Sequence, residues 1–88
     1  MTVRLRDKDL SWRILDGEVV ALDTAGSVYL GANASGAQLW KLLAAGAERD
    51  ELADALVTTY GLEREAAERD VDRFLAELRG AGLLVDEA

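Results

Sequence analysis

The side chains that could do chemistry in this chain of 88 residues are almost all carboxylates. Seventeen residues are aspartate or glutamate, and the sequence contains neither histidine nor cysteine. Histidine is the commonest general base and metal ligand, and cysteine supplies the usual thiolate nucleophile. Carboxylate pairs such as Asp50 with Asp54 and Asp70 with Glu77 lie at helical spacing, which is typical of a solvated helix face. The sequence therefore predicts no catalytic residue, no metal and no cofactor.

The serines and glycines also lack the partners that their chemistry requires. Ser11, Ser27 and Ser35 have no histidine to activate them, and no nucleophile elbow is present. The segment 31–36 is bounded by glycines but fits neither a phosphate loop nor a dinucleotide-binding fingerprint. It is typical of a turn between a strand and a helix. We expect the chain not to be an enzyme.

The charge balance narrows the possible partners. Ten basic residues against seventeen acidic ones give a net charge of −7, which opposes binding to nucleic acid because phosphate neutralisation supplies most of that affinity. No apolar run approaches the roughly 20 residues that span a bilayer, and the N-terminus lacks the apolar stretch of a signal peptide. We expect a single cytoplasmic domain over residues 1–88, without a membrane partner.

The elements that would position a site divide into strands first and helices afterwards. Residues 12–15, 18–23 and 27–31 are β-prone, and Asp16-Gly17 is a strong hairpin signal because both turn positions favour positive φ. Val3 and Leu5 alternate with arginines, as in a short edge strand. Apolar residues recur at helical spacing over about 33–46, 48–60 and 64–79. The closing apolar run at 83–85 either caps the core or adds a strand.

This order predicts an α+β fold in which a three-stranded antiparallel sheet is followed by three helices, an arrangement that is winged helix-turn-helix-like. The shape admits a winged-helix DNA-binding regulator as an alternative function. A recognition helix would need basic and amide side chains pointing outward. The second and third predicted helices instead offer mostly acidic residues, which oppose insertion into a DNA groove.

The strand at 27–31 contains neither a charge nor a proline. Natural edge strands are commonly blunted by one or the other, because an open edge exposes unpaired backbone N–H and C=O groups. Two interpretations remain open: the edge is covered by the protein's own chain, or it is available to add a partner strand. An open edge is compatible with a monomer or a weak dimer.

Several segments, taken in order, resemble the PqqD-like family of recognition elements for ribosomally made, post-translationally modified peptides. These segments are WRILDGEVVALD at 12–23, YLGAN at 29–33, GAQLWKLL at 36–43, DELADAL at 50–56, YG at 60–61, DVDRFLAEL at 70–78 and GLL at 82–84. The short link at 29–33, the Ser35-Gly36 pair and the length resemble the discrete leader-binding proteins of lasso-peptide pathways.

The resemblance implies a domain that binds the leader of a precursor peptide as an extra strand and brings it to a leader peptidase or another modifying enzyme. In relatives, the leader adds to the third strand, and the third helix forms the other wall of the cleft. Carried over by position, the receiving strand comprises Ser27, Val28, Tyr29, Leu30 and Gly31. The opposing wall comprises Asp70, Val71, Arg73, Phe74, Glu77 and Leu78.

Overall fold

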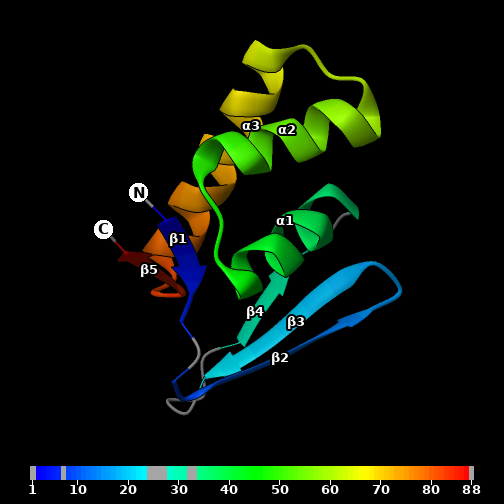
Figure 1. Cartoon of the computed structure of the whole chain (residues 1–88). Coiled ribbons are helices and arrows are strands. Elements are labelled where there is room, and N and C mark those ends of the chain that lie inside the picture. Colours follow the sequence, from blue (N-terminus) through cyan, green and yellow to red (C-terminus); the bar gives the residue numbers. More distant parts are fainter. Residues whose placement is uncertain (1, 7, 24–27, 32–33, 88) are drawn as a thin grey trace.

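The computed structural model describes residues 2–6, 8–23, 28–31 and 34–87, without the side chains of 28–31, 34 and 87. Within these described residues, five strands and three helices follow one another in an α+β arrangement (Figure 1). In chain order they are β1 (Thr2–Leu5), β2 (Leu10–Leu15), β3 (Glu18–Asp23), β4 (Val28–Gly31), α1 (Ala34–Ala45), α2 (Arg49–Tyr60), α3 (Arg64–Gly80) and β5 (Leu84–Glu87).

Strands β2, β3 and β4 form the predicted three-stranded antiparallel meander, in that order. The hairpin between β2 and β3 turns at Asp16 and Gly17, whose φ angles are 52° and 79°. Two positive φ angles are the signature of a type I′ turn, whose twist matches that of the flanking strands. This turn sets the register by pairing Leu15 with Glu18.

A second sheet, which the sequence did not predict as such, joins the two ends of the chain. Strand β1 pairs with β5 in antiparallel register, from Thr2 opposite Glu87 to Leu5 opposite Leu84. On its other side β1 bridges to Ala47, whose N–H donates to the Val3 carbonyl at 2.9 Å. The expectation of a single sheet was therefore wrong. The apolar tail forms strand β5, which pairs with β1 in a second sheet apart from the meander.

The helices begin and end close to their predicted limits. Glu48 precedes α2, and its backbone N–H donates to the Glu51 carboxylate at 3.2 Å. Gly61 ends α2 in the left-handed region, with its N–H donating to the Val57 carbonyl, as a glycine C-cap does. No described helix is long and apolar enough to cross a membrane.

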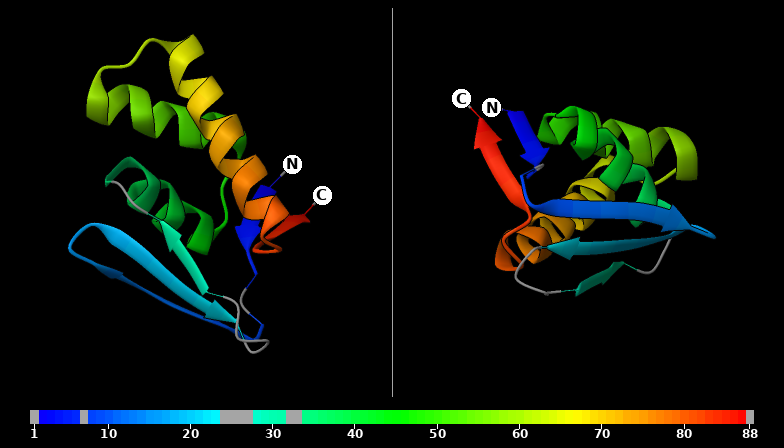
Figure 2. Two further views of the ribbon diagram at one scale, coloured as in Figure 1. Left: turned by 180° about the vertical axis from the view of Figure 1, so that it is seen from behind. Right: turned by 90° about the horizontal axis from the view of Figure 1, so that it is seen from below.

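Helix α1 lies between the meander and α2 in Figure 1 and in the left view of Figure 2, and α3 runs past it on one side. Val19 and Ala21 of β3 are buried beneath it, and the rings of Trp12 and Trp40 meet edge to face with centroids 5.9 Å apart. The fully buried Trp40 lies at the centre of the core. Helix α1 therefore packs against β3 on one side and against α2 on another.

Candidate functional site

The edge of β4 is open along the described part of the chain. Sheet order puts β4 at one end of the meander, where β3 is its only described strand partner. This end is the one on the α3 side of the sheet (Figure 2). The N-terminal strand pairs with β5 in the other sheet, so the interpretation that this strand covers the edge is wrong.

The register identifies which backbone groups face outward from β4. Opposite residues in an antiparallel pair alternate between exchanging both hydrogen bonds and exchanging none. A two-residue hairpin makes Leu15 and Glu18 a bonded pair, so Val20 and Leu22 also direct their backbone groups toward β2. Tyr29, opposite Ala21, then bonds to β3, while the N–H and C=O groups of Val28 and Leu30 face the open edge.

A pocket of about 240 Å³ lies among the helices on this side of the molecule. Four predicted wall residues line it from one face of α3, at the spacing i, i+3, i+4 and i+7 that places side chains together. The start of α1 and one residue of α2 complete it. The lining residues are Ser35, Gly36, Leu39, Leu56, Asp70, Arg73, Phe74 and Glu77.

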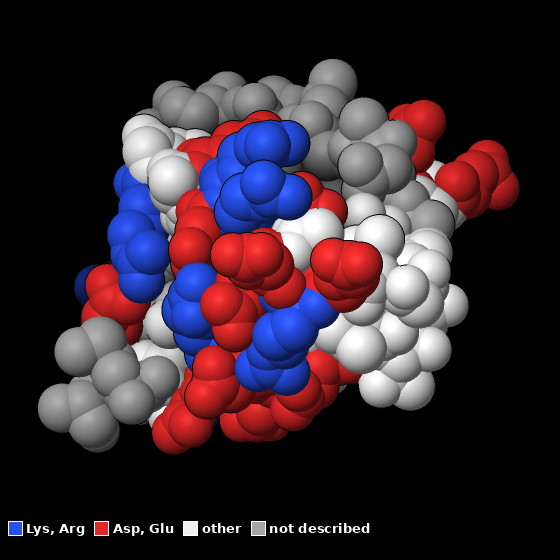
Figure 3. Space-filling model, turned by 90° about the horizontal axis from the view of Figure 1, so that it is seen from above, with Lys and Arg blue, Asp and Glu red and all other residues white. Residues whose placement is uncertain are grey.

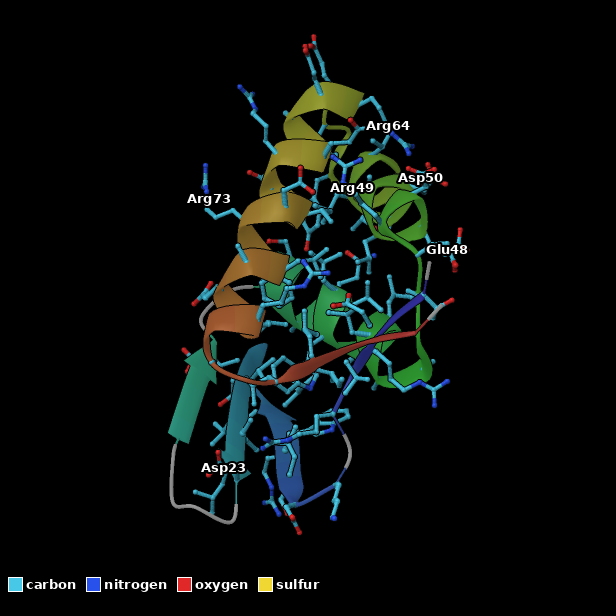
Figure 4. The ribbon with its side chains drawn as sticks, turned by 90° about the vertical axis from the view of Figure 1, so that its left-hand side faces the viewer. Asp23, Glu48, Arg49, Asp50, Arg64 and Arg73 are labelled. Carbon is cyan, nitrogen blue, oxygen red and sulfur yellow. The ribbon has the colours of Figure 1, made fainter. Side chains whose placement is uncertain are left out.

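Two other predicted wall residues, Val71 and Leu78, are fully buried in the core. They sit on the α3 face that packs inward, so the structure separates them from the pocket. Arg73 extends from α3 away from α2, on the side where β4 lies (Figure 4). Ser27 and the side chains of Val28, Tyr29 and Leu30 fall outside the described part of the structure. Gly31 is the last residue of β4, where it pairs with Val19.

Comparison with known proteins decides the family. The sequence pattern of the family described as "Coenzyme PQQ synthesis protein D (PqqD)" matches residues 18–84. This match runs from the start of β3 to the first residue of β5. The chain belongs to the PqqD family. The resemblance inferred from the sequence is thus confirmed.

Two solved structures resemble this PqqD-family chain over nearly its whole length. "TbiB1 in Complex with the TbiA(beta) Leader Peptide" has 31% identity and a TM-score of 0.84, with 97% of this chain and 98% of that chain covered. "Lasso peptide synthetase B1 complexed with the leader peptide" has 28% identity and a TM-score of 0.80, with 96% and 98% covered. No curated protein matches the chain.

The charges of this PqqD-family domain are arranged differently on the two sides of α3. Between α2 and α3, Arg49 donates two hydrogen bonds to Asp72, at 2.6 and 2.8 Å. Arg64 contacts Glu68 at 3.1 Å and also pairs with Asp54. The hydrogen bond and charge of Arg49 lower the pKa of Asp72, and the same contact raises the pKa of Arg49. Acidic and basic side chains accordingly interleave over this face (Figure 3).

The charged residues on the pocket side of α3 differ from those that face α2. Within the described part of the chain, Asp70, Arg73 and Glu77 form no ion pair, although they line the pocket at adjacent turns. No group of three described residues is arranged to hold a metal ion. The site therefore combines an open strand edge, an apolar pocket floor and a rim of free charges.

Sequence reasoning missed four of the pocket-lining residues. The helical periodicity at 33–46 and 48–60 includes Leu39 and Leu56, and both are buried. Each also lines the pocket. Ser35 and Gly36 fall in the predicted turn at 31–36 and in the pair that resembles leader-binding proteins, but the sequence did not predict that they line a site. The sequence signal that could have found them is the small size of both residues at the start of a helix.

Proposed function

We propose that this domain binds the leader segment of a ribosomally made precursor peptide as a strand added to β4, and delivers it to a leader peptidase or another modifying enzyme, in lasso-peptide biosynthesis. The observation that carries the proposal is the open β4 edge beside the pocket. Family membership and the leader peptides in the two similar structures support it.

The physical basis of binding would be backbone pairing. The two N–H groups that Val28 and Leu30 direct outward can donate to the backbone of an antiparallel peptide, and their two C=O groups can accept hydrogen bonds from it. Each such hydrogen bond contributes about 1 kcal/mol net, so pairing alone gives modest affinity. Pockets that bind every second side chain of the peptide supply the remaining affinity and the sequence specificity. A leader that is disordered when free loses conformational entropy on docking, which keeps binding reversible.

The pocket residues would select leader side chains. Phe74 is half-buried and offers its ring together with the pocket floor. Asp70, Arg73 and Glu77 surround it and can pair with leader charges at the rim, where such pairs affect the association rate more than the affinity. We assign no catalytic step to any residue, and we take residues 1–88 as one binding domain.

We also propose that the domain has a winged helix-turn-helix-like shape. Helices α2 and α3 are joined by only three residues, 61–63, and pack against one another, as in a helix-turn-helix pair. We propose that this pair serves as the wall of a peptide cleft. A DNA-binding regulator is the alternative function for the same shape, and the acidic helix surfaces count against it.

Amide hydrogen exchange with the leader peptide encoded beside this gene tests strand addition at single residues. In the free domain the amides of Val28 and Leu30 should exchange fast, and saturating peptide should slow both at least tenfold. Tyr29 and Gly31 should be protected before the peptide is added. The outward amides of Trp12 and Ile14, on the opposite edge strand, provide the matched control and should not change. Protection that appears on β2, or on neither edge, would contradict the proposal.

A further inference from the structure

The meander has a second edge, at the end opposite to β4. Sheet order puts β2 there, and β3 is its only strand partner among the described residues. Leu15 and Glu18 exchange hydrogen bonds at the hairpin. Bonded positions alternate along an antiparallel strand, so the backbone N–H and C=O groups of Leu10, Trp12 and Ile14 face away from β3. Within the described part of the chain, this edge is therefore also open to another strand.

The side chains that flank the β2 edge are largely apolar. On the inner face of the meander, which packs against α1, Trp12 is 39% exposed although its ring meets that of Trp40. Leu10 and Ile14 are half-buried on either side of it. Arg13 is the one charged residue of the strand, and it lies on the outer face. Natural edge strands are commonly blunted by inward-pointing charges or by proline, and β2 contains neither.

The sequence of β2 complements itself in one antiparallel register. When Trp12 pairs with Trp12 of a second copy, the outward backbone groups of both strands meet and form up to about six hydrogen bonds. Leu10 then lies opposite Ile14 of the second copy, and Ser11 lies opposite its Arg13. An axis through Arg13 would instead place two arginines directly opposite one another, which is unfavourable. An axis through Ser11 would pair residues 10–12 only.

The net charge of the domain lies mainly outside this part of the chain. Residues 1–47 carry five basic and five acidic side chains, whereas residues 48–88 carry five basic and twelve acidic ones. The excess of acid therefore belongs to the segment that contains α2, α3 and β5, and acidic side chains crowd the helical face (Figure 3). Repulsion between two copies comes mainly from these exposed groups, where salt screens it.

The size of the contact indicates how tightly two copies would associate. Five paired residues with a rise of about 3.4 Å each make a strip about 17 Å long, and with a depth of about 10 Å it covers roughly 170 Å². A stable protein–protein interface buries about 800 Å² on each partner. Association through β2 would therefore be weak and reversible.

We infer that this domain forms a two-fold dimer through the β2 edge, in which the Trp12 residues of the two copies pair on the axis and the two meanders join into one sheet. The axis would run perpendicular to that sheet, so the helices of both copies lie on the same side of it. Because β4 lies at the opposite end of each meander (Figure 2), both β4 edges stay open at the outer ends. Dimerisation does not depend on the proposed leader binding.

Charges introduced at Ser11 test the register. Ser11 is exposed and pairs with the exposed Leu22 within its own sheet, so its substitution leaves the core intact. Ser11→Lys would face Arg13 of the second copy with a like charge, and Ser11→Glu would face it with an opposite one. Val85→Lys and Val85→Glu are the matched controls, because they change the net charge equally on β5, where Val85 is 45% exposed.

Sedimentation equilibrium between about 10 μM and 1 mM, without leader peptide, measures the dimer dissociation constant of each variant. Circular dichroism checks that each variant is folded. Hydrogen exchange at low and high protein concentration reports whether the amides of Trp12 and Ile14 become protected as the dimer forms.

The unsubstituted domain should dimerise within this range, with slower exchange at Trp12 and Ile14 at the higher concentration. Ser11→Lys should weaken the dimer at least tenfold, and Ser11→Glu should strengthen it at least threefold although it makes the domain more acidic. The two Val85 variants should stay within twofold of the unsubstituted domain.

A domain that is monomeric at every concentration overturns the inference. Association that follows net charge, so that Ser11→Lys strengthens it and Ser11→Glu weakens it, also overturns the inference. A dimer that responds to the Val85 variants and not to the Ser11 variants assigns the contact to another surface, with the same consequence. Because no leader peptide is present, a failure of leader binding would leave each of these results unchanged.

Discussion

Neighbouring residues of α3 have different roles because each is rotated by about 100° from the last. Asp70, Arg73, Phe74 and Glu77 follow one another on the face that lines the pocket. Leu78, one position after Glu77, is fully buried. The six wall residues implied by the family resemblance therefore belong to two faces of α3. One face lines the pocket, and the other is buried in the core.

We expect Leu78→Ala to destabilise the domain by about 2–5 kcal/mol, the usual cost of a buried leucine-to-alanine cavity. Glu77→Ala, on the exposed neighbour, should change stability by less than about 0.5 kcal/mol. Urea unfolding followed by circular dichroism measures both. If Leu78→Ala leaves too little folded protein, Leu78→Met should remain within about 1.5 kcal/mol of the unsubstituted domain because it conserves volume. Equal stabilities for the Leu78→Ala and Glu77→Ala variants would contradict the division of α3 into two faces.

At the scale of elements, the position of α3 depends on its contacts with α2 and β5. Arg49 joins the start of α2 to Asp72 in α3, and Arg79 donates to Asp86 of β5 at 2.7 Å. These pairs lie on the surface, where each contributes little alone. Together with the buried stripe of α3 they determine the direction in which its pocket face points.

These contacts predict a pH dependence of stability. The hydrogen bond and charge of Arg49 lower the pKa of Asp72, and those of Arg79 lower the pKa of Asp86. A carboxyl group whose pKa is lower in the folded state stabilises the fold above its unfolded pKa. That contribution is lost as the pH falls through the folded pKa.

We expect the free energy of unfolding to fall between pH 5 and about pH 2, and to fall less in the Asp72→Asn variant. Asp70→Asn is the matched control on the same helix, since Asp70 forms no ion pair within the described part of the chain. Denaturant unfolding at a series of pH values measures the slopes. A steeper loss in Asp72→Asn than in the unsubstituted domain would contradict the stabilising role of the Arg49–Asp72 pair.

At the scale of the whole molecule, net charge separates peptide recognition from DNA recognition. The chain carries −7, and the surface of α2 and α3 is rich in acidic side chains, several of which pair with Arg49 and Arg64 (Figure 3). A DNA binder of this shape would present a cluster of free cations on one of these helices. The electrostatic field of this domain instead repels a phosphate backbone.

We therefore expect no electrophoretic mobility shift of duplex DNA by this domain at low ionic strength, the condition that most favours binding. Any true DNA complex should form there first and weaken steeply as salt is added. A winged-helix DNA-binding protein tested in parallel provides the positive control. A shift that disappears over such a salt series would revive the regulator as the function of this fold.

Local features of this protein were determined by its sequence alone. The hairpin at Asp16-Gly17 depends on two residues that tolerate positive φ. The limits of α2 and α3 depend on apolar spacing and on Gly61. The PqqD family could also be inferred from the order of such segments. These features are predictable because the interactions that produce them join residues within a few positions of one another.

Only the tertiary structure decided how distant segments meet. The pairing of Thr2 with Glu87 joins opposite ends of the chain, and the pocket combines residues from three helices. The helical periodicity includes Leu39 and Leu56 but could not show that both also line a pocket. The apolar pattern of a strand indicates that one of its faces is buried, but it does not determine which strand pairs with it. That choice depends on the packing of the whole core, which here leaves one edge of β4 without a strand partner among the described residues.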